Sequence, residues 1–204
     1  MSIHRCPQIS LSSIPKVEEI EIENTETVAL PTRFNLQTLK KLTITGRKKP
    51  IKYDQEIGTT VTIAEGKLGS RSNKPEVTLT NCRINKIAKQ MNLKKLKVES
   101  SLFPDTEQKI FQNIDSANID ELEIENSDIL SIFKLGLSRY SQPFTFSDNQ
   151  IHSSCQTGGD DQNCFLQPHG SSVYEHNRIQ CGCSTYDGDE CVTRDKGFYF
   201  FPDI

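Results

Sequence analysis

Leu93-Lys-Lys-Leu96-Lys-Val98 places one apolar residue three positions before a second and five before a third. The same spacing recurs in Val17-Glu-Glu-Ile20-Glu-Ile22, Leu39-Lys-Lys-Leu42-Thr-Ile44 and Ile119-Asp-Glu-Leu122-Glu-Ile124, and shorter copies stand at Val77-Thr-Leu79 and Phe144-Thr-Phe146. A short strand that buries only alternate side chains cannot make a core alone. The pattern therefore predicts units that stack in one direction.

The middle apolar residue of each segment, together with Val61 of the similar Val61-Thr-Ile63, gives the spacing of the units. From Ile20 to Phe144 the successive separations are 22, 19, 16, 19, 26 and 22 residues. Repeats of roughly 20–29 residues contain one strand and a short link, whereas repeats built from two helices are longer. The spacing thus favours strand-based repeats.

A polar residue downstream of several strands gives a second test. Val77-Thr-Leu79-Thr-Asn-Cys82-Arg-Ile84 and Phe144-Thr-Phe146-Ser-Asp-Asn149-Gln-Ile151 place Cys or Asn before another apolar residue, and Ser127 keeps that spacing in its unit. In the first two units Thr25 and Arg47 occupy the position. The chain here resembles the leucine-rich repeat family, in which Asn or Cys bonds the turning backbone.

The resemblance implies an α/β solenoid of irregular leucine-rich repeats. Its curved parallel sheet would form one face, irregular links or short helices the other, and a disulfide-rich cap would close the C-terminus. A β-sandwich or a parallel β-helix remains an open alternative, because alternation such as Ile20-Glu-Ile22 indicates only a half-buried strand.

Both ends of the chain resemble the cysteine-bearing caps of extracellular members of the family. Cys6-Pro-Gln-Ile-Ser-Leu11-Ser-Ser-Ile14-Pro15 is similar to the close of an N-terminal cap, and Asn177-Arg-Ile179-Gln-Cys181-Gly-Cys183 to the opening of a C-terminal cap. We therefore expect a remnant of an N-terminal cap at 1–16, repeats at 17–152 and a cysteine-rich cap at 153–204.

The seven cysteines indicate an oxidising compartment, so we expect a secreted or extracellular protein. Cys82, within the repeat pattern, is expected to be a buried unpaired thiol. The disulfide candidates are the remaining six, whose pairing stays open: Cys6, Cys155, Cys164, Cys181, Cys183 and Cys191. No segment has the roughly 20 apolar residues of a membrane helix, so no membrane span is expected in this chain.

The charges are unevenly distributed. Residues 40–97 contain 15 basic and 4 acidic residues, a net charge of +11, whereas the remainder carries −14. Stacked strands make outward residues neighbours, so much of this charge is expected to pair internally. The expected partners are Glu18, Glu19 and Glu21 with Lys40 and Lys41, and Lys94, Lys95 and Lys97 with Asp120, Glu121 and Glu123.

The basic residues that this pairing leaves out suggest a polyanion site, with a sulfated glycan as the expected ligand. The candidates are Arg47, Lys48, Lys49, Lys52, Arg83, Lys86 and Lys89. Nucleic acid is not expected as a partner, because Tyr53 is the one aromatic residue available for base stacking in this region.

No motif in the chain indicates catalysis. A glycine-rich phosphate loop, a nucleophile elbow and a His-Glu-x-x-His helix are all absent, and the four histidines have no nucleophile at a recognisable spacing. The cysteine and histidine spacing after His169 does not match zinc-binding pairs. We therefore expect no enzymatic activity, no cofactor and no metal site.

The expected function is recognition of a protein ligand through outward strand residues, since a stacked sheet presents a wide, rigid surface. The candidate contacts are Glu21, Thr43, Thr45, Thr78, Thr80, Lys97, Glu123 and Thr145. Two alternatives remain open: a sulfated-glycan binder that uses the basic 47–89 region, and a non-catalytic scaffold subunit of a secreted complex.

Overall fold

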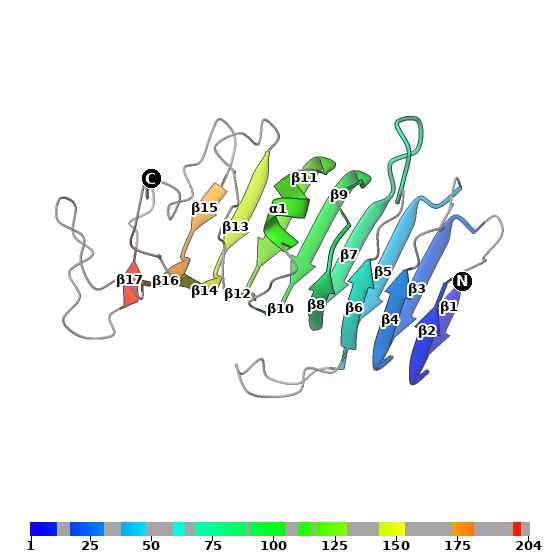
Figure 1. Cartoon of the computed structure of the whole chain (residues 1–204), viewed down its shortest axis with the longest axis horizontal. Coiled ribbons are helices and arrows are strands. Elements are labelled where there is room, and N and C mark those ends of the chain that lie inside the picture. Colours follow the sequence, from blue (N-terminus) through cyan, green and yellow to red (C-terminus); the bar gives the residue numbers. More distant parts are fainter. Residues whose placement is uncertain are drawn as a thin grey trace.

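The protein is a parallel β-solenoid with two sheets (Figure 1). The computed structural model describes residues 1–11, 17–30, 38–47, 59–63, 68–88, 90–104, 110–115, 117–129, 143–153, 173–181 and 198–200. Within these ranges α1 (Ile110–Asp115) is the one helix, and all other regular structure is strand.

The odd-numbered strands up to β15 form one sheet, here called sheet A. Its order is β1 (Ser2–His4), β3 (Glu19–Glu23), β5 (Lys41–Thr45), β7 (Glu76–Thr80), β9 (Asn92–Glu99), β11 (Asn118–Glu125), β13 (Phe144–Ser147) and β15 (Val173–Glu175). Every neighbouring pair in sheet A is parallel.

The even-numbered strands form the second sheet, sheet B, which β17 joins at one edge. Its order is β2 (Gln8–Ser10), β4 (Thr27–Leu30), β6 (Thr59–Ile63), β8 (Cys82–Lys86), β10 (Leu102–Phe103), β12 (Asp128–Ile129), β14 (Gln150–Ser153), β16 (Arg178–Cys181) and β17 (Phe198–Phe200). β17 runs antiparallel to β16, whereas the other pairs are parallel. Because the chain alternates between sheets, each neighbour within a sheet comes from the next coil.

The core lies between the two sheets and consists of continuous rows of aliphatic side chains. In sheet A, Ile22 aligns with Ile44, and further along the sheet Val98 aligns with Ile124. Leu79 joins Ile44 to Val98, and all five side chains are 0% exposed. The prediction that these residues form successive rungs of one parallel coil is confirmed.

The second face of the solenoid corrects the sequence interpretation. Where irregular links or short helices were expected, the described residues form sheet B. Val61, which had been counted as an anchor of the same sheet as Leu42, lies on β6 in sheet B and pairs with Val28 and Ile84. The parallel β-helix alternative is closer to this arrangement than a single sheet backed by links.

Residues 1–11, expected to be part of a cap remnant, contribute one strand to each sheet. β1 pairs with β3 in sheet A and β2 pairs with β4 in sheet B, both in parallel. Ile9 and Leu11 belong to the common hydrophobic core. The first described coil therefore repeats the architecture of those that follow.

Tight corners join several sheet A strands to the sheet B strands that follow them, as between β3 and β4, β7 and β8, and β11 and β12. Asn24, Asn81 and Asn126 stand at these corners with φ between 47° and 55°, the left-handed region that Asn tolerates better than most residues. Their backbone N–H groups donate to the carbonyl that ends the next sheet A strand, for example Asn81 to Glu99 at 3.1 Å. The corners thus stack with the same spacing as the strands.

Gly46 directly follows β5, at the position that Asn81 takes after β7, and its backbone N–H donates to the Thr80 carbonyl at 2.8 Å. A Cβ atom at Gly46 would lie 2.0 Å from the backbone oxygen of Asn81. This close approach of two backbones requires glycine.

Candidate functional site: the outer face of sheet A

The outer face of sheet A carries rows of polar side chains at the alternate positions of each strand. One row contains Glu21, Thr43, Thr78, Lys97, Glu123 and Thr145, which are consecutive register partners. All six are exposed or half-buried, while the residues on either side of each one in sequence are buried. The strands of the solenoid therefore place these six predicted contact residues on one surface.

The remaining predicted contacts, Thr45 and Thr80, are register partners in the next row. With Thr43 and Thr78 they make a two-by-two group on β5 and β7, which we call the threonine block. All four side chains are half-buried. The block is an uncharged area within a face that is otherwise strongly charged.

Acidic residues predominate on this face. Among the residues that the register aligns in rows along this face, nine are glutamate and three are lysine, and the exposed Lys94 at the start of β9 also contacts Glu76 of this face. The glutamates are Glu19, Glu21, Glu23, Glu76, Glu99, Glu121, Glu123, Glu125 and Glu175, and the lysines are Lys41, Lys95 and Lys97. The basic excess of residues 40–97 is therefore not a property of this surface.

Ion pairs neutralise much of the charge between β9 and β11. Lys95 Nζ lies 2.9 Å from Glu121 and 2.5 Å from Glu123. Lys97 Nζ lies 2.8 Å from Glu125 and 3.6 Å from Glu123. The expected pairing of Lys95 and Lys97 with Glu121 and Glu123 is confirmed.

This network shifts the protonation equilibria of its members. Partial burial is the largest single effect on Glu123 and opposes its ionisation, but the hydrogen bonds with Lys95 and Glu121 and the charges of Lys95 and Lys97 together outweigh it and lower the pKa. Burial likewise opposes the charge on Lys95, and the bonds to Glu123 and Glu121 raise its pKa. The hydrogen bond to Glu125 is the main cause of the raised pKa of Lys97. The network is therefore held in its charged form near neutral pH.

Other predicted ion pairs are confirmed in part. Lys40 contacts Glu18 at 2.9 Å, as expected. Lys94 contacts Glu76 at 2.6 Å instead of an acidic residue of β11, and that hydrogen bond lowers the pKa of Glu76. Asp120 contacts Lys74 at 2.5 Å.

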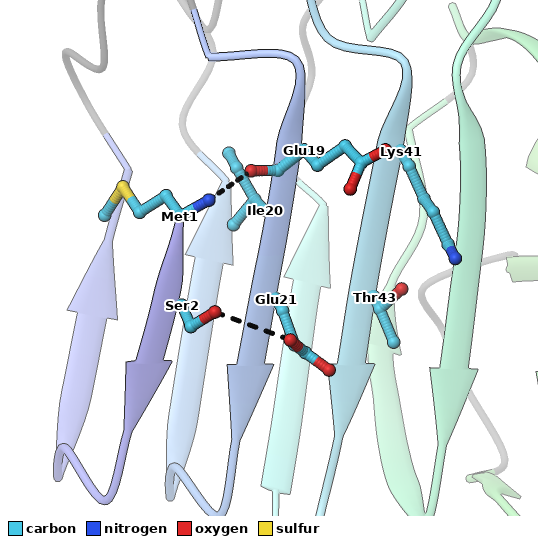
Figure 2. Close-up of a pocket in the computed structure, with 7 residues that line it drawn as sticks. All are labelled: Met1, Ser2, Glu19, Ile20, Glu21, Lys41 and Thr43. Carbon is cyan, nitrogen blue, oxygen red and sulfur yellow. Dashed lines mark hydrogen bonds between the residues drawn. The ribbon is translucent and has the colours of Figure 1, made fainter.

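A shallow depression opens at the N-terminal end of the face, across β1, β3 and β5 (Figure 2). Its volume is about 130 Å³, and the residues that line it are Met1, Ser2, Glu19, Ile20, Glu21, Lys41 and Thr43. Ser2 Oγ donates to Glu21 at 3.4 Å, and the positively charged N-terminal ammonium of Met1 donates to the Glu19 carbonyl at 2.7 Å. The depression is polar and bounded by two carboxylates.

Glu19, Lys41 and Ser2 were not among the predicted binding residues. The sequence did contain the signal for Glu19, because it lies two positions before Glu21 and alternation puts both on one face. The position of Ser2 depends on β1 being a strand of the solenoid, which the cap interpretation did not anticipate.

Three of the seven predicted polyanion residues lie in the part of the chain that the structure describes. Arg83 and Lys86 lie half-buried on β8 in sheet B, and Arg47 is exposed at the corner after β5. Lys48, Lys49, Lys52 and Lys89 lie outside the described residues. The sheet B position of Arg83 and Lys86 separates them from the threonine block.

Two of the cysteines have described side chains, and both are free thiols: Cys6, which is partly exposed, and Cys82, which is buried. Burial raises the pKa of the Cys82 thiol to about 12. Its Sγ donates to the Thr80 carbonyl at 3.2 Å, as expected for a thiol at the turn position. Cys155, Cys164, Cys183 and Cys191 lie outside the described residues, as does the side chain of Cys181, which ends β16.

Over the described ranges, no group of three or more His, Cys, Asp or Glu side chains could hold a metal ion. No helix in the same part of the chain is long and apolar enough to cross a membrane.

Comparison with known proteins gives no relative: no family model matches the chain, and neither a curated protein nor a solved structure shows significant similarity to it.

Proposed function

We propose that this chain is a secreted or cell-surface, non-enzymatic protein that binds a protein ligand through the outer face of sheet A. The observation that carries the proposal is the threonine block on a surface of aligned parallel strands. Hydrogen-bonded neighbours on both sides hold β5 and β7, so the four threonines are fixed before a ligand arrives. Binding to a preorganised surface costs little conformational entropy.

The ion pairs indicate which candidates contact the ligand. Lys97 and Glu123 are engaged with each other and with neighbouring charges, and the Glu123 side chain is 16% exposed. A ligand that contacted Lys97 or Glu123 would have to break these ion pairs. The free energy lost in breaking them would offset much of the free energy gained from the new contact. We therefore place the centre of the contact at the threonine block, with Glu21 and Thr145 at its periphery.

The same proposal includes the leucine-rich repeat identity and a disulfide-rich C-terminal cap. Cys82, Ser127 and Asn149 support the first, because all three bond backbone groups at the turn, as that family's Asn and Cys do. Support for the cap and for secretion comes from the five cysteines between Cys155 and Cys191.

The test compares one substitution pair on each face of the solenoid. Thr43→Tyr/Thr78→Tyr changes two register partners of sheet A, and Thr27→Tyr/Thr60→Tyr changes two register partners of sheet B. Tyr suits β-strands, so both variants should fold, which thermal unfolding checks. Cross-linking mass spectrometry then measures stoichiometric partners captured from the source organism's extracellular fluid.

The proposal expects capture to fall at least tenfold in the sheet A variant and to stay within twofold in the sheet B variant. Equal capture by the two variants, or loss only in the sheet B variant, would contradict it.

A second candidate function is binding of a sulfated glycan by sheet B. Arg83 and Lys86 lie on β8, and β2, β4, β6 and β8 contain no acidic residue. Arg83→Gln/Lys86→Gln should then reduce retention on a heparin column, whereas Lys40→Gln/Lys94→Gln, which removes two exposed lysines elsewhere, should not. Flow-through of the unmodified protein at physiological salt would remove this candidate.

A further inference from the structure

We infer that the protein ligand presents a basic surface, and that one of its Lys or Arg side chains binds in the depression between Glu19 and Glu21. The inference rests on the proposed function and specifies the chemistry of the partner. Its basis is the position of charges on sheet A, which the sequence alone did not reveal.

The charge of the whole face supports a cationic partner. Nine glutamates and three lysines stand among the residues that the register aligns in rows along this face. A surface with such an excess attracts basic proteins over distances of about 10 Å in 0.1 M salt and accelerates their encounter. An acidic partner or a sulfated glycan would be repelled.

Glu19 and Glu21 of β3 are among the carboxylates of this face that no described lysine contacts. Glu121, Glu123 and Glu125 contact Lys95 or Lys97 within 3 Å. Glu19 and Glu21, by contrast, have no ion pair within the described part of the chain, and both are exposed. Glu21 accepts one hydrogen bond from the neutral hydroxyl of Ser2. These two carboxylates can therefore bind a cation without breaking an existing pair.

The shape of the surface at this point suits one side-chain group. Figure 2 shows Glu19 and Glu21 on the same strand, with Ser2 on one side and Lys41 and Thr43 on the other. A volume of about 130 Å³ equals that of roughly four water molecules, enough for a guanidinium or ammonium group. A guanidinium can donate to both carboxylates at once, and such charge-assisted bonds are short and directional.

Two positive groups line the depression: the N-terminal ammonium of Met1, which donates to the Glu19 carbonyl at 2.7 Å, and the side chain of Lys41. Lys41 is the register partner of Glu19 and also interacts electrostatically with Glu76 on the far side of β5. The cation of the ligand is therefore expected beside Glu21, away from Lys41 and from the Met1 ammonium. From there, the remainder of a ligand surface can extend over Thr43 to the threonine block.

The experiment compares two variants with the same change in net charge. Glu19→Gln/Glu21→Gln neutralises the depression, and Glu26→Gln/Asp148→Asn neutralises two exposed carboxylates at corners. Asn is well suited to the left-handed backbone of Asp148, whose φ is 56°. The probe is a fluorescent octa-arginine amide, and its Kd is measured by anisotropy at low and at physiological salt.

The inference expects the Glu19→Gln/Glu21→Gln variant to bind the probe at least fivefold more weakly, and the corner variant to stay within twofold of the parent. Titration of arginine amide should move the NMR amide signals of Ser2, Glu21 and Thr43. Equal weakening in both variants would show only a general attraction of charge and would overturn the inference, as would signal changes confined to other strands.

The inference and the proposed function can fail separately. Suppose that the threonine-block variant loses partner capture, but the Kd of the probe does not change in the Glu19→Gln/Glu21→Gln variant. The proposed binding face is then supported, and the inference of a basic partner is wrong. If partner capture does not depend on the threonine block, the proposed function fails whatever the probe does.

Discussion

Asn149 Oδ1 accepts a hydrogen bond from the backbone N–H of Ser127 at 2.9 Å, so a buried side chain of one coil completes the turn of the preceding coil. Its Nδ2 donates to the Ile124 carbonyl at 2.8 Å and to Asn177 Oδ1 at 2.9 Å. The preceding coils repeat this contact in the same direction: Ser127 Oγ accepts from the Ser101 N–H at 3.2 Å, and Ser101 Oγ accepts from the Cys82 N–H at 3.0 Å. This corner ladder satisfies backbone groups that no strand partner reaches.

The corner ladder predicts a graded response at Asn149, which is 1% exposed. Asn149→Ala leaves the Ser127 N–H and the Ile124 carbonyl without these partners and should lower the free energy of unfolding by about 2–4 kcal/mol. Asn149→Ser should cost less, because Ser at the equivalent corners of preceding coils accepts the same kind of backbone bond. Urea unfolding followed by circular dichroism measures both, and equal losses would contradict the role of the ladder.

Gly46→Ala should be destabilising because Gly46 is buried against the backbone of the next coil. The added Cβ would meet the Asn81 carbonyl oxygen at 2.0 Å, and displacing backbone costs about 1–3 kcal/mol. Asn126→Gly, at a corner with φ of 47°, is the control and should change stability by less than about 1 kcal/mol. Thermal unfolding distinguishes them, and a neutral Gly46→Ala would show that the corners do not stack this closely.

Glu123 should make the free energy of unfolding depend on pH in the acidic range. Its folded-state pKa lies below the usual 4.5, so the folded protein favours the carboxylate more than the unfolded chain does. The stabilisation is complete above about pH 5 and is lost as the pH falls through the folded pKa. Glu123→Gln should therefore cost roughly 1 kcal/mol at pH 7 and less as the pH falls toward 2, measured by urea unfolding. A cost that is the same at both values would rule out this ion-pair effect.

Cys82 should resist alkylation in the folded protein. Burial holds its pKa near 12, so almost no thiolate is present at pH 8. Iodoacetamide followed by peptide mapping should label Cys82 only after denaturation, whereas partly exposed Cys6 should be labelled in the native state. Rapid native labelling of Cys82 would place it outside the core.

The strands of sheet A could be predicted from the sequence because their pattern has two parts. Leu96 and Val98 give the alternation of a half-buried strand, and the charged residues between and before them identify the outward side. Repetition of that pattern implied parallel stacking, which the register of Leu96 with Leu122 confirms.

Sheet B could not be predicted in the same way. Val61-Thr-Ile63 has the alternation of a sheet A strand, and alternation says that one side is buried without saying which sheet the strand joins. β10 and β12 are two residues long, too short for any periodic signal. The corners between sheet A and sheet B depend on single residues such as Asn81, which has a left-handed backbone. The sequence pattern does not reveal that conformation.

The candidate site was predicted in its outward positions but not in its charge balance. Choosing Glu21, Thr43 and Thr78 required only alternation. Recognising an acidic face required knowing that Arg83 and Lys86 lie in sheet B. It also required knowing that Lys95 and Lys97 form ion pairs with glutamates of β11. Both facts depend on which strands are neighbours. The sequence interpretation did not include sheet B and therefore could not predict them.

The alternation of consecutive strands between two sheets is the claim on which the binding face depends, and inter-strand NOEs between backbone protons test it most directly. We predict NOEs that join Thr43 to Thr78 and Thr60 to Arg83 in parallel register, and none between Thr43 and Thr60. NOEs that place Thr60 beside Thr43, or an antiparallel pattern between β5 and β7, would contradict the account.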